Sequence, residues 1–246
     1  SPFDTGAYAS RQTYVSGMAV KKTGAIFKEK ILDYAAYMLE KPQDTLDVRD
    51  NHIVDKETGK QLLPMEELAT TAFYSLDRSV HITAEVTNHC KENTFAFGCC
   101  FAEVEVDIPL GKVKIQNMVN VHDSGKLINP ALAEAQVHGG MSMGIGYALT
   151  EEMKFDPKTG KTLNGTLLDY KLSTTMDHPE LKADFVENYE PTSAYGTKAL
   201  GEPPVCSVAP AIRNAVFNAT GVGVDTLPLS PHVLFEEFRK GGLLDV

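Results

Sequence analysis

The segment from Asn129 to Thr150 constrains the fold of this chain more than any other. Asn129 can cap a helix, and Pro130 follows at the first helical position, where the missing N–H is harmless. The residues after Pro130 are apolar almost all round, so we expect this helix to be central. Glycines recur along it, at Gly139, Gly140, Gly144 and Gly146. Each weakens a helix by about 0.5–1 kcal/mol relative to alanine, which indicates close packing against the backbone there.

The rest of the chain alternates between strands and helices. From Cys99 to Ile108, apolar residues alternate with acidic ones, which predicts a half-buried strand. A turn at residues 109–112 leads into a second predicted strand, Val113–His122. Further expected elements are a helix after residue 12, a small meander over residues 45–63, strands at 80–86, 167–172 and 183–189, and helices at 208–220 and 232–240. Because no linker or repeat interrupts them, the sequence predicts a single α+β unit over residues 1–246, with mixed sheets packed against helices.

The composition argues against two kinds of partner. The formal net charge is −10, so a nucleic-acid partner is not expected. No apolar run reaches membrane-spanning length, so no membrane partner is expected either. The cysteines, Cys90, Cys99, Cys100 and Cys206, show no CxxC spacing. We interpret them as buried free thiols in a reducing compartment, the cytoplasm.

Residues 4–11 form a loop of small and hydroxyl-bearing residues that leads into a helix. Unpaired amide groups and the helix dipole make such a position attractive to anions, and Arg11 adds positive charge. The loop is therefore a candidate anion site. A helix cap with a tight turn is the alternative interpretation.

Gln136 precedes His138, Gly139 and Gly140 in the apolar helix. A glutamine amide can both donate and accept hydrogen bonds, which suits recognition of the edge of a heterocycle. The alternative is a core amide satisfied by the backbone. His138 is interpreted as a core histidine.

Glu202 lies between Gly201 and Pro203-Pro204, just before a predicted helix. The prolines fix the backbone on one side and the glycine frees it on the other, so the carboxylate is held at the tip of a loop. A carboxylate in this position suits a general base. A first-turn glutamate that favours the helix dipole is the alternative.

Several motifs follow one another in a characteristic order. They are TGAYASRQTY at 5–14, FAEVEVD at 101–107, VHDSGK at 121–126, QVHGG at 136–140 and GEPP at 201–204. This series resembles the C-terminal third of the molybdenum subunits of the xanthine dehydrogenase and aldehyde oxidase family, and is most like its bacterial purine-hydroxylating branch. The resemblance covers nearly the whole chain. It implies that the α+β unit is the C-terminal portion of a molybdenum-cofactor-binding domain.

The resemblance also implies a cofactor and a reaction. The family binds molybdopterin, in most bacterial members as the cytosine dinucleotide, and hydroxylates heteroaromatic carbons or aldehydes with water as oxygen donor. The residues it places against the cofactor are Gly6, Ala7, Tyr8, Ala9, Ser10, Arg11, Gln136 and Gly201. Glu202 would be the catalytic base that takes the proton from a Mo–OH group. The predicted substrates are purines, hypoxanthine or xanthine.

The resemblance makes the chain one part of a larger enzyme. The four scattered cysteines form no cluster-binding motif, so no metal-ligating residue is predicted, and iron–sulfur clusters and FAD are expected on other chains or domains. The expected partners are the rest of the molybdenum subunit, an iron–sulfur subunit, a FAD subunit and a small heteroaromatic substrate. Because the chain opens without methionine in the predicted loop, we expect a fragment, a processed chain or a piece of a split subunit that is inactive alone.

Two alternatives stay open from the sequence. Hydroxylation of another N-heterocycle, or oxidation of an aldehyde, would use the same base. A non-catalytic assembly subunit is the alternative outside enzymes, and the intact Gly201-Glu202 pair argues against it.

Overall fold

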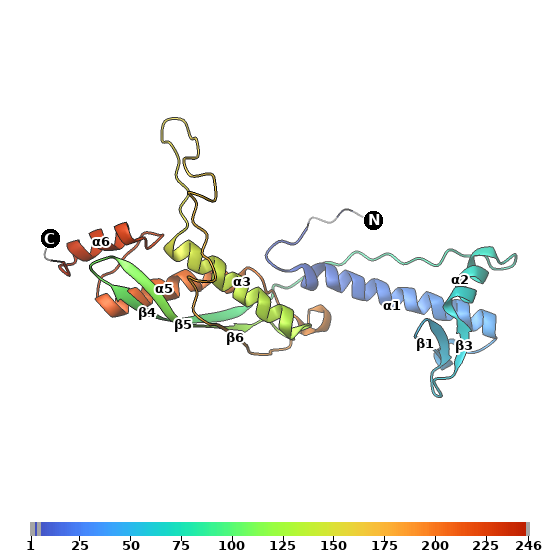
Figure 1. The fold of residues 1–246 in the computed structure, drawn as a ribbon. Coiled ribbons are helices and arrows are strands. Elements are labelled where there is room, and N and C mark those ends of the chain that lie inside the picture. The colour runs from blue at the N-terminus through green and yellow to red at the C-terminus, as the bar shows by residue number, and fades with distance from the viewer. Residues whose placement is uncertain (1–2, 4–5, 245–246) are drawn as a thin grey trace. The chain divides into compact units, whose positions relative to one another are not determined.

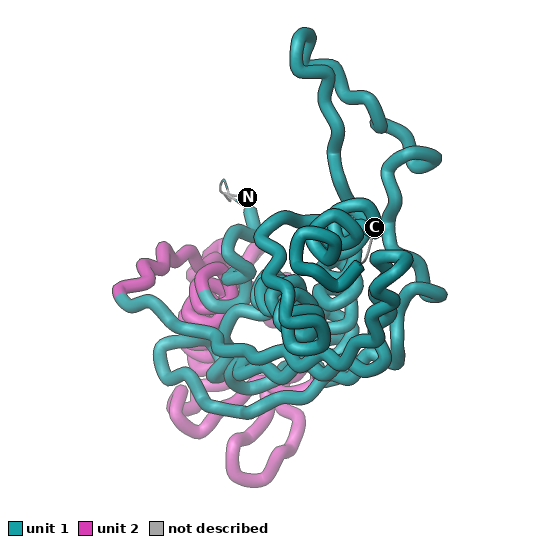
Figure 2. Tube along the Cα trace, turned by 90° about the vertical axis from the view of Figure 1, so that its left-hand side faces the viewer, with its two compact units in different colours: residues 1–14, 92–246 teal, residues 15–91 magenta. Residues whose placement is uncertain are grey.

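The computed structural model of the chain describes residue 3 and residues 6–244. Its contacts fall into two compact units (Figure 2), one formed by the chain up to Tyr14 and from Glu92 onward, the other by Val15–Lys91. This differs from the single unit predicted over residues 1–246. The sequence does not reveal the first junction because it falls inside a continuous helix, α1, Gln12–Leu39.

The smaller unit contains most of α1 and a three-stranded antiparallel sheet. The strands are β1 (Leu46–Arg49), β2 (His52–Asp55) and β3 (Gln61–Pro64), which confirms the predicted meander. A short 3-10 helix (Gln43–Thr45) precedes β1, and α2 (Met65–Tyr74) follows β3. Tyr34, Ile53 and Leu68 are buried at its centre. The strand expected at residues 80–86 is wrong, because this stretch has no neighbouring strand to pair with.

The larger unit is built on a mixed sheet with the order β4-β5-β6. β4 (Phe97–Asp107) and β5 (Lys112–Asp123) are antiparallel, and β6 (Leu181–Phe185) pairs parallel to β5. The alternation predicted for β4 is confirmed: Ala102, Val104 and Val106 pack on the core, while Glu103 and Glu105 are exposed. A β-bulge beside Glu103 and Val104 shifts the register, so that Ile115 and Met118 both face the core. The same buried row continues through Asn120 and His122.

Helices pack on this sheet (Figure 1). They are α3 (Pro130–Leu149), α4 (Pro203–Cys206), α5 (Val208–Thr220) and α6 (Pro231–Lys240), with a 3-10 helix at Ala194–Gly196. α3 begins where the sequence predicts, since the Asn129 side chain accepts a hydrogen bond from the Leu132 amide at 3.1 Å. Val137, Met141 and Ile145 of α3 are buried in the main core together with Ile212 of α5. The α+β class and the mixed sheet are therefore as predicted.

Glycines let α3 approach the start of α4 and α5. A Cβ added at Gly140 would lie 2.6 Å from Pro204 Cβ, and one at Gly144 would lie 2.5 Å from Val208 Cβ. A Cβ at Gly146 would meet the Glu151 carboxylate. Gly139 differs, because nothing lies within 4 Å of the position of its Cβ. The close packing inferred from the sequence thus holds at Gly140, Gly144 and Gly146, and it is wrong at Gly139.

The chain between α3 and β6 forms an exposed arm, residues 151–180 (Figure 1). The strand expected at 167–172 is wrong: this stretch folds into turns, and the Asp169 and Tyr170 amides both donate to the Thr166 carbonyl. Large apolar side chains are exposed along the arm, namely Met153, Phe155, Leu163, Leu167, Leu168 and Met176.

Two further expectations concern the cysteines and the membrane. All four cysteines are free, but Cys90, Cys99 and Cys206 are exposed, so the prediction of buried thiols is wrong for these three. Among the described residues, no helix combines the length and the apolar character that crossing a membrane requires.

The glycine contacts predict opposite effects of the same substitution in one helix. Gly144→Ala should lower the free energy of unfolding by about 1–3 kcal/mol, because the new methyl group overlaps Val208. Gly139→Ala is the matched control and should raise it by about 0.5–1 kcal/mol, since the methyl group meets open space and favours helix. Urea denaturation of the two variants measures both. Equal destabilisation by both substitutions would contradict this packing.

Candidate functional site

Ser10 and Glu202 are hydrogen-bonded to each other twice, although 192 positions separate them. The Glu202 amide donates to Ser10 Oγ at 2.8 Å, and the Ser10 hydroxyl donates to Glu202 Oε2 at 3.1 Å. The loop at the start of the chain and the loop before α4 therefore meet at one point. The serine holds both the backbone and the carboxylate of the predicted base.

Gly201 and Gln136 complete this cluster. A Cβ at Gly201 would lie 2.9 Å from Ser10 Oγ and 3.3 Å from Gln136 Nε2, so only glycine fits between these side chains without a shift. The backbone at Gly201, with φ of +152°, is also one that L side chains rarely adopt. Gln136 is exposed on α3, so its amide is not a satisfied core amide. The structure thus brings together four of the residues predicted from the sequence.

The other predicted loop residues lie beside Ser10 in sequence. Gly6, Ala7, Tyr8 and Arg11 are exposed, and none of them is hydrogen-bonded to Glu202. Ala9 and Ser10 both have φ of 52°, a left-handed conformation that costs of order 1–3 kcal/mol for a residue other than glycine. Asp4 and Thr5 lie outside the described residues.

Tyr14 anchors the end of this loop. Its side chain is buried, and its hydroxyl contacts the Glu92 carbonyl at 3.2 Å and Thr192 Oγ1 at 2.9 Å. Tyr14 was not predicted from the sequence to be a site residue. The only sign of this role in the sequence is that Tyr14 belongs to the same motif as Ser10, at residues 5–14.

A cavity of about 300 Å³, lined by both polar and apolar side chains, adjoins the cluster. Its walls include Ser10, Gln136, Ser124, Lys126, Asn129 and Lys198. Ser124 is buried, and its hydroxyl has no hydrogen-bond partner among the described residues. The first turn of α3 also lies here, but its Leu132 amide donates to Asn129, and the ammonium groups of Lys126 and Lys198 pair with Glu187 and Asp123. The unpartnered Ser124 hydroxyl is therefore a wall group that is still available to a ligand. Residues 121–126 form one of the motifs in the sequence, but they were not predicted to belong to the site.

A buried ion pair fixes the wall of this cavity. Lys198 Nζ lies 2.7 Å from Asp123 Oδ2, and the two side chains are only 6% and 13% exposed. Burial raises the pKa of Asp123, but hydrogen bonds from Lys198, the Gly125 amide and Asn188 outweigh it, so the pKa lies below its ordinary value. The Lys198 amide also donates to the Ser124 carbonyl at 2.8 Å. The segment that leads to Glu202 is therefore tied to the end of β5.

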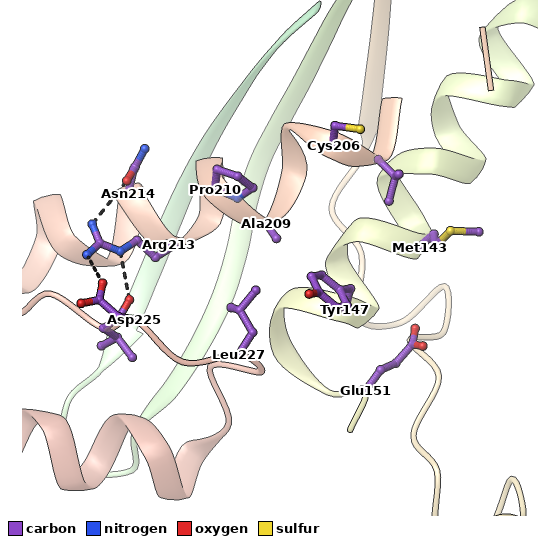
Figure 3. A pocket seen from close by; sticks show the side chains of 12 residues that line it. Met143, Tyr147, Glu151, Cys206, Ala209, Pro210, Arg213, Asn214, Asp225 and Leu227 are labelled. Carbon is purple, nitrogen blue, oxygen red and sulfur yellow. Dashed lines mark hydrogen bonds and ion pairs between the residues drawn. The ribbon is translucent and has the colours of Figure 1, made fainter. Parts of the chain in front are cut away.

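A second, larger cavity contains no residue predicted to be in the site. It measures about 750 Å³ and is lined mainly by apolar side chains from α3 and α5 (Figure 3). Its one guanidinium, that of Arg213, already bonds the Val224 carbonyl at 3.0 Å and Asp225 at 3.0 Å. Nothing in this apolar groove resembles the polar cluster at Glu202. Among the described residues, no group of three or more His, Cys, Asp or Glu side chains is arranged to hold a metal ion.

The sequence of residues 1–179 matches a known family, described as the molybdopterin cofactor-binding domain. The chain belongs to this family. The match includes Ser10 and Gln136, while Gly201 and Glu202 lie beyond it.

One relative aligns with nearly the whole chain, so that its alignment also covers residues 201–204. The xanthine dehydrogenase molybdenum-binding subunit of Escherichia coli O157:H7 is 51% identical over 99% of the chain and 33% of its own length. The aldehyde oxidoreductase molybdenum-binding subunit of the same organism is 35% identical over 60% of the chain and 20% of its own length. The chain therefore spans about a third of the length of its xanthine dehydrogenase relative.

The fold is also shared with a solved structure. Quinoline 2-oxidoreductase from Pseudomonas putida 86 superposes with a TM-score of 0.83 at 26% identity, over 97% of the chain and 31% of that protein. The expected α+β portion of a molybdenum-cofactor-binding domain is confirmed by this likeness together with the family match.

The Lys198–Asp123 pair predicts a strong effect of removing one charge. Lys198→Met leaves a buried carboxylate without its cation and should lower the free energy of unfolding by about 3–5 kcal/mol at neutral pH. The matched control is Lys126→Met, which breaks an exposed pair with Glu187 and should cost less than about 1 kcal/mol. Since the folded pKa of Asp123 is lowered, its contribution is present above pH of about 4 and is lost as the pH falls further. Denaturation curves at several pH values measure the free energy of unfolding of both variants and its pH dependence. An effect of Lys198→Met as small as that of Lys126→Met would contradict the importance of the buried pair.

Proposed function

We propose that this chain carries the catalytic base of a molybdenum hydroxylase that oxidises purines, hypoxanthine or xanthine, with water as oxygen donor. The observation that supports this most is the meeting of Ser10, Gln136, Gly201 and Glu202 at the edge of the 300 Å³ cavity. The 51% identity to a xanthine dehydrogenase subunit favours purines. The likeness to quinoline 2-oxidoreductase keeps another N-heterocycle as the alternative substrate.

The residues around Glu202 fit a molybdopterin, which we propose to be the cytosine dinucleotide form. The loop residues Gly6–Arg11 would lie along the cofactor, and Gln136 would face its pterin. The unpartnered Ser124 hydroxyl would donate a hydrogen bond to a polar group of the cofactor. When bound, this cofactor supplies the two-electron oxidation and the transfer of a water-derived oxygen.

Glu202 acts in this proposal by accepting a proton. The Ser10 hydroxyl engages Oε2, so we assign Oε1 as the accepting atom. Glu202 occupies the N-cap position of α4, yet its side chain makes no capping hydrogen bond. This supports a base rather than a residue that serves the helix dipole. It also argues against a non-catalytic assembly subunit, which needs no carboxylate held in this way.

Other parts of the enzyme would complete the reaction. We propose that the rest of the molybdenum subunit covers the apolar arm at residues 151–180, and that an iron–sulfur subunit and a FAD subunit remove the electrons. The small heteroaromatic substrate would reach Glu202 from the side of the cofactor. The free cysteines support a reducing compartment, the cytoplasm, as the location.

Glu202→Gln in the assembled full-length enzyme tests the base directly. The amide keeps the shape of the side chain but cannot accept the proton, so kcat for xanthine should fall by about 10²–10⁴. Molybdenum content and the free energy of unfolding should stay near wild type. Glu236→Gln, a change in an exposed side chain of α6, is the matched control and should leave kcat unchanged. Turnover of Glu202→Gln within about threefold of wild type would exclude this role.

The incomplete site predicts weak cofactor binding by residues 1–246 expressed alone. The 300 Å³ cavity beside Ser10 is open, and the loop that would lie along the cofactor is largely exposed. Metal analysis after purification should therefore find much less than one molybdenum per chain, while the full-length subunit prepared in the same host retains it. A stoichiometric content in the short chain would show that these residues suffice.

A further inference from the structure

The loop that carries Glu202 continues into two prolines, which cannot donate backbone hydrogen bonds. Any hydrogen bond that holds this part of the backbone must therefore be accepted by a carbonyl oxygen. The buried Asn120 of β5 supplies the donor: its Nδ2 lies 3.0 Å from the Pro204 carbonyl oxygen. This contact joins the sheet to the backbone two residues after Glu202.

Pro204 also packs directly against the backbone of α3. The position of a Cβ at Gly140 lies 2.6 Å from Pro204 Cβ and 3.1 Å from its carbonyl carbon. Pro204 is itself buried. The proline is therefore clamped between an amide from β5 and the bare backbone of α3. Together with Ser10, which holds the Glu202 amide, this fixes the loop on both sides of the carboxylate.

The chemistry of Asn120 shows that its amide serves this contact. The side chain is fully buried, and its Oδ1 has no hydrogen-bond partner among the described residues. Burying an oxygen in this way is unfavourable, and a leucine of similar size would avoid it. Asn120 follows the apolar residues Ile115 and Met118 in this buried row, and what an asparagine adds at its position is the donor to Pro204.

We propose that Asn120 is a positioning residue for Glu202, which acts by holding the Pro204 carbonyl so that the carboxylate keeps a fixed place beside Ser10 and Gln136. The proposal rests on the proposed role of Glu202 as base. A general base must lie within hydrogen-bond reach of the proton it accepts, so a small shift of its loop lowers the rate without changing the groups that bind substrate.

The test uses the assembled full-length enzyme with the substitution Asn120→Leu. We expect kcat for xanthine to fall about 10- to 100-fold, with KM within about threefold of wild type and an unchanged molybdenum content. Amide hydrogen exchange in residues 200–206 should become faster. His122→Leu is the matched control, since His122 lies in the same buried row of β5 and neither nitrogen of its ring has a hydrogen-bond partner among the described residues. It should leave both kcat and exchange in residues 200–206 near wild type.

Gly140→Ala tests the contact between Pro204 and α3. It is also the second test of the proposal if Asn120→Leu yields no folded enzyme. Its methyl group should displace Pro204 and give the same loss of kcat at constant KM. The positioning role would be overturned by an unchanged kcat in either folded variant, or by an equal loss of kcat in His122→Leu. Failure of both variants to give enzyme with cofactor would also overturn it. If Glu202→Gln proves active, the proposed function fails. Hydrogen exchange in Asn120→Leu then still reports whether Asn120 holds the loop.

Discussion

The close approach of α3 to the chain at Pro204 and Val208 is the constraint on which the site depends. Because Gly140 and Gly144 lack side chains, the helix backbone lies directly against these residues. Gln136 sits one turn before Gly140 on the same helix, so this contact also brings its amide next to Gly201. A helix with ordinary side chains at these positions would stand further from α4 and separate Gln136 from Glu202. The glycines therefore lower the intrinsic stability of the helix and in return set the geometry of the cluster.

Polar contacts then fix what the packing brings together. Ser10 bonds the amide and the carboxylate of Glu202, and the buried pair of Lys198 and Asp123 ties the preceding segment to β5. Asn120 holds the following segment through Pro204. A carboxylate fixed in this way loses little freedom when a substrate and cofactor are in place, which is the arrangement that efficient proton transfer requires. In the proposed function, the chain would contribute position and charge, while the redox chemistry would belong to the cofactor.

The sequence was informative wherever a pattern is local. The alternation in β4 and the Asn129-Pro130 start of α3 predicted elements that the structure confirms. The strands expected at 80–86 and 167–172 failed, because alternation specifies a strand only when another strand lies alongside it. Glu202 and Gln136 stood out by their neighbours in sequence. Ser10 lay in a loop whose composition predicted an anion site, and the family resemblance placed it against the cofactor. The hydrogen bonds between Ser10 and Glu202 could not be read from positions so distant in the chain, and Asn120 carries no signal at all because it lies in an ordinary strand pattern.

The central claim is that Ser10, Gln136 and Glu202 face one molybdenum cofactor. Anomalous scattering at the molybdenum edge, recorded from crystals of the full-length enzyme, locates the metal without assumptions about the protein. The account predicts a single peak on the Glu202 side of Gly201, with the carboxylate within hydrogen-bond reach of a group on the metal and Gln136 beside the pterin. A peak in the apolar groove of Figure 3, or one beyond the reach of the Glu202 side chain, would contradict it.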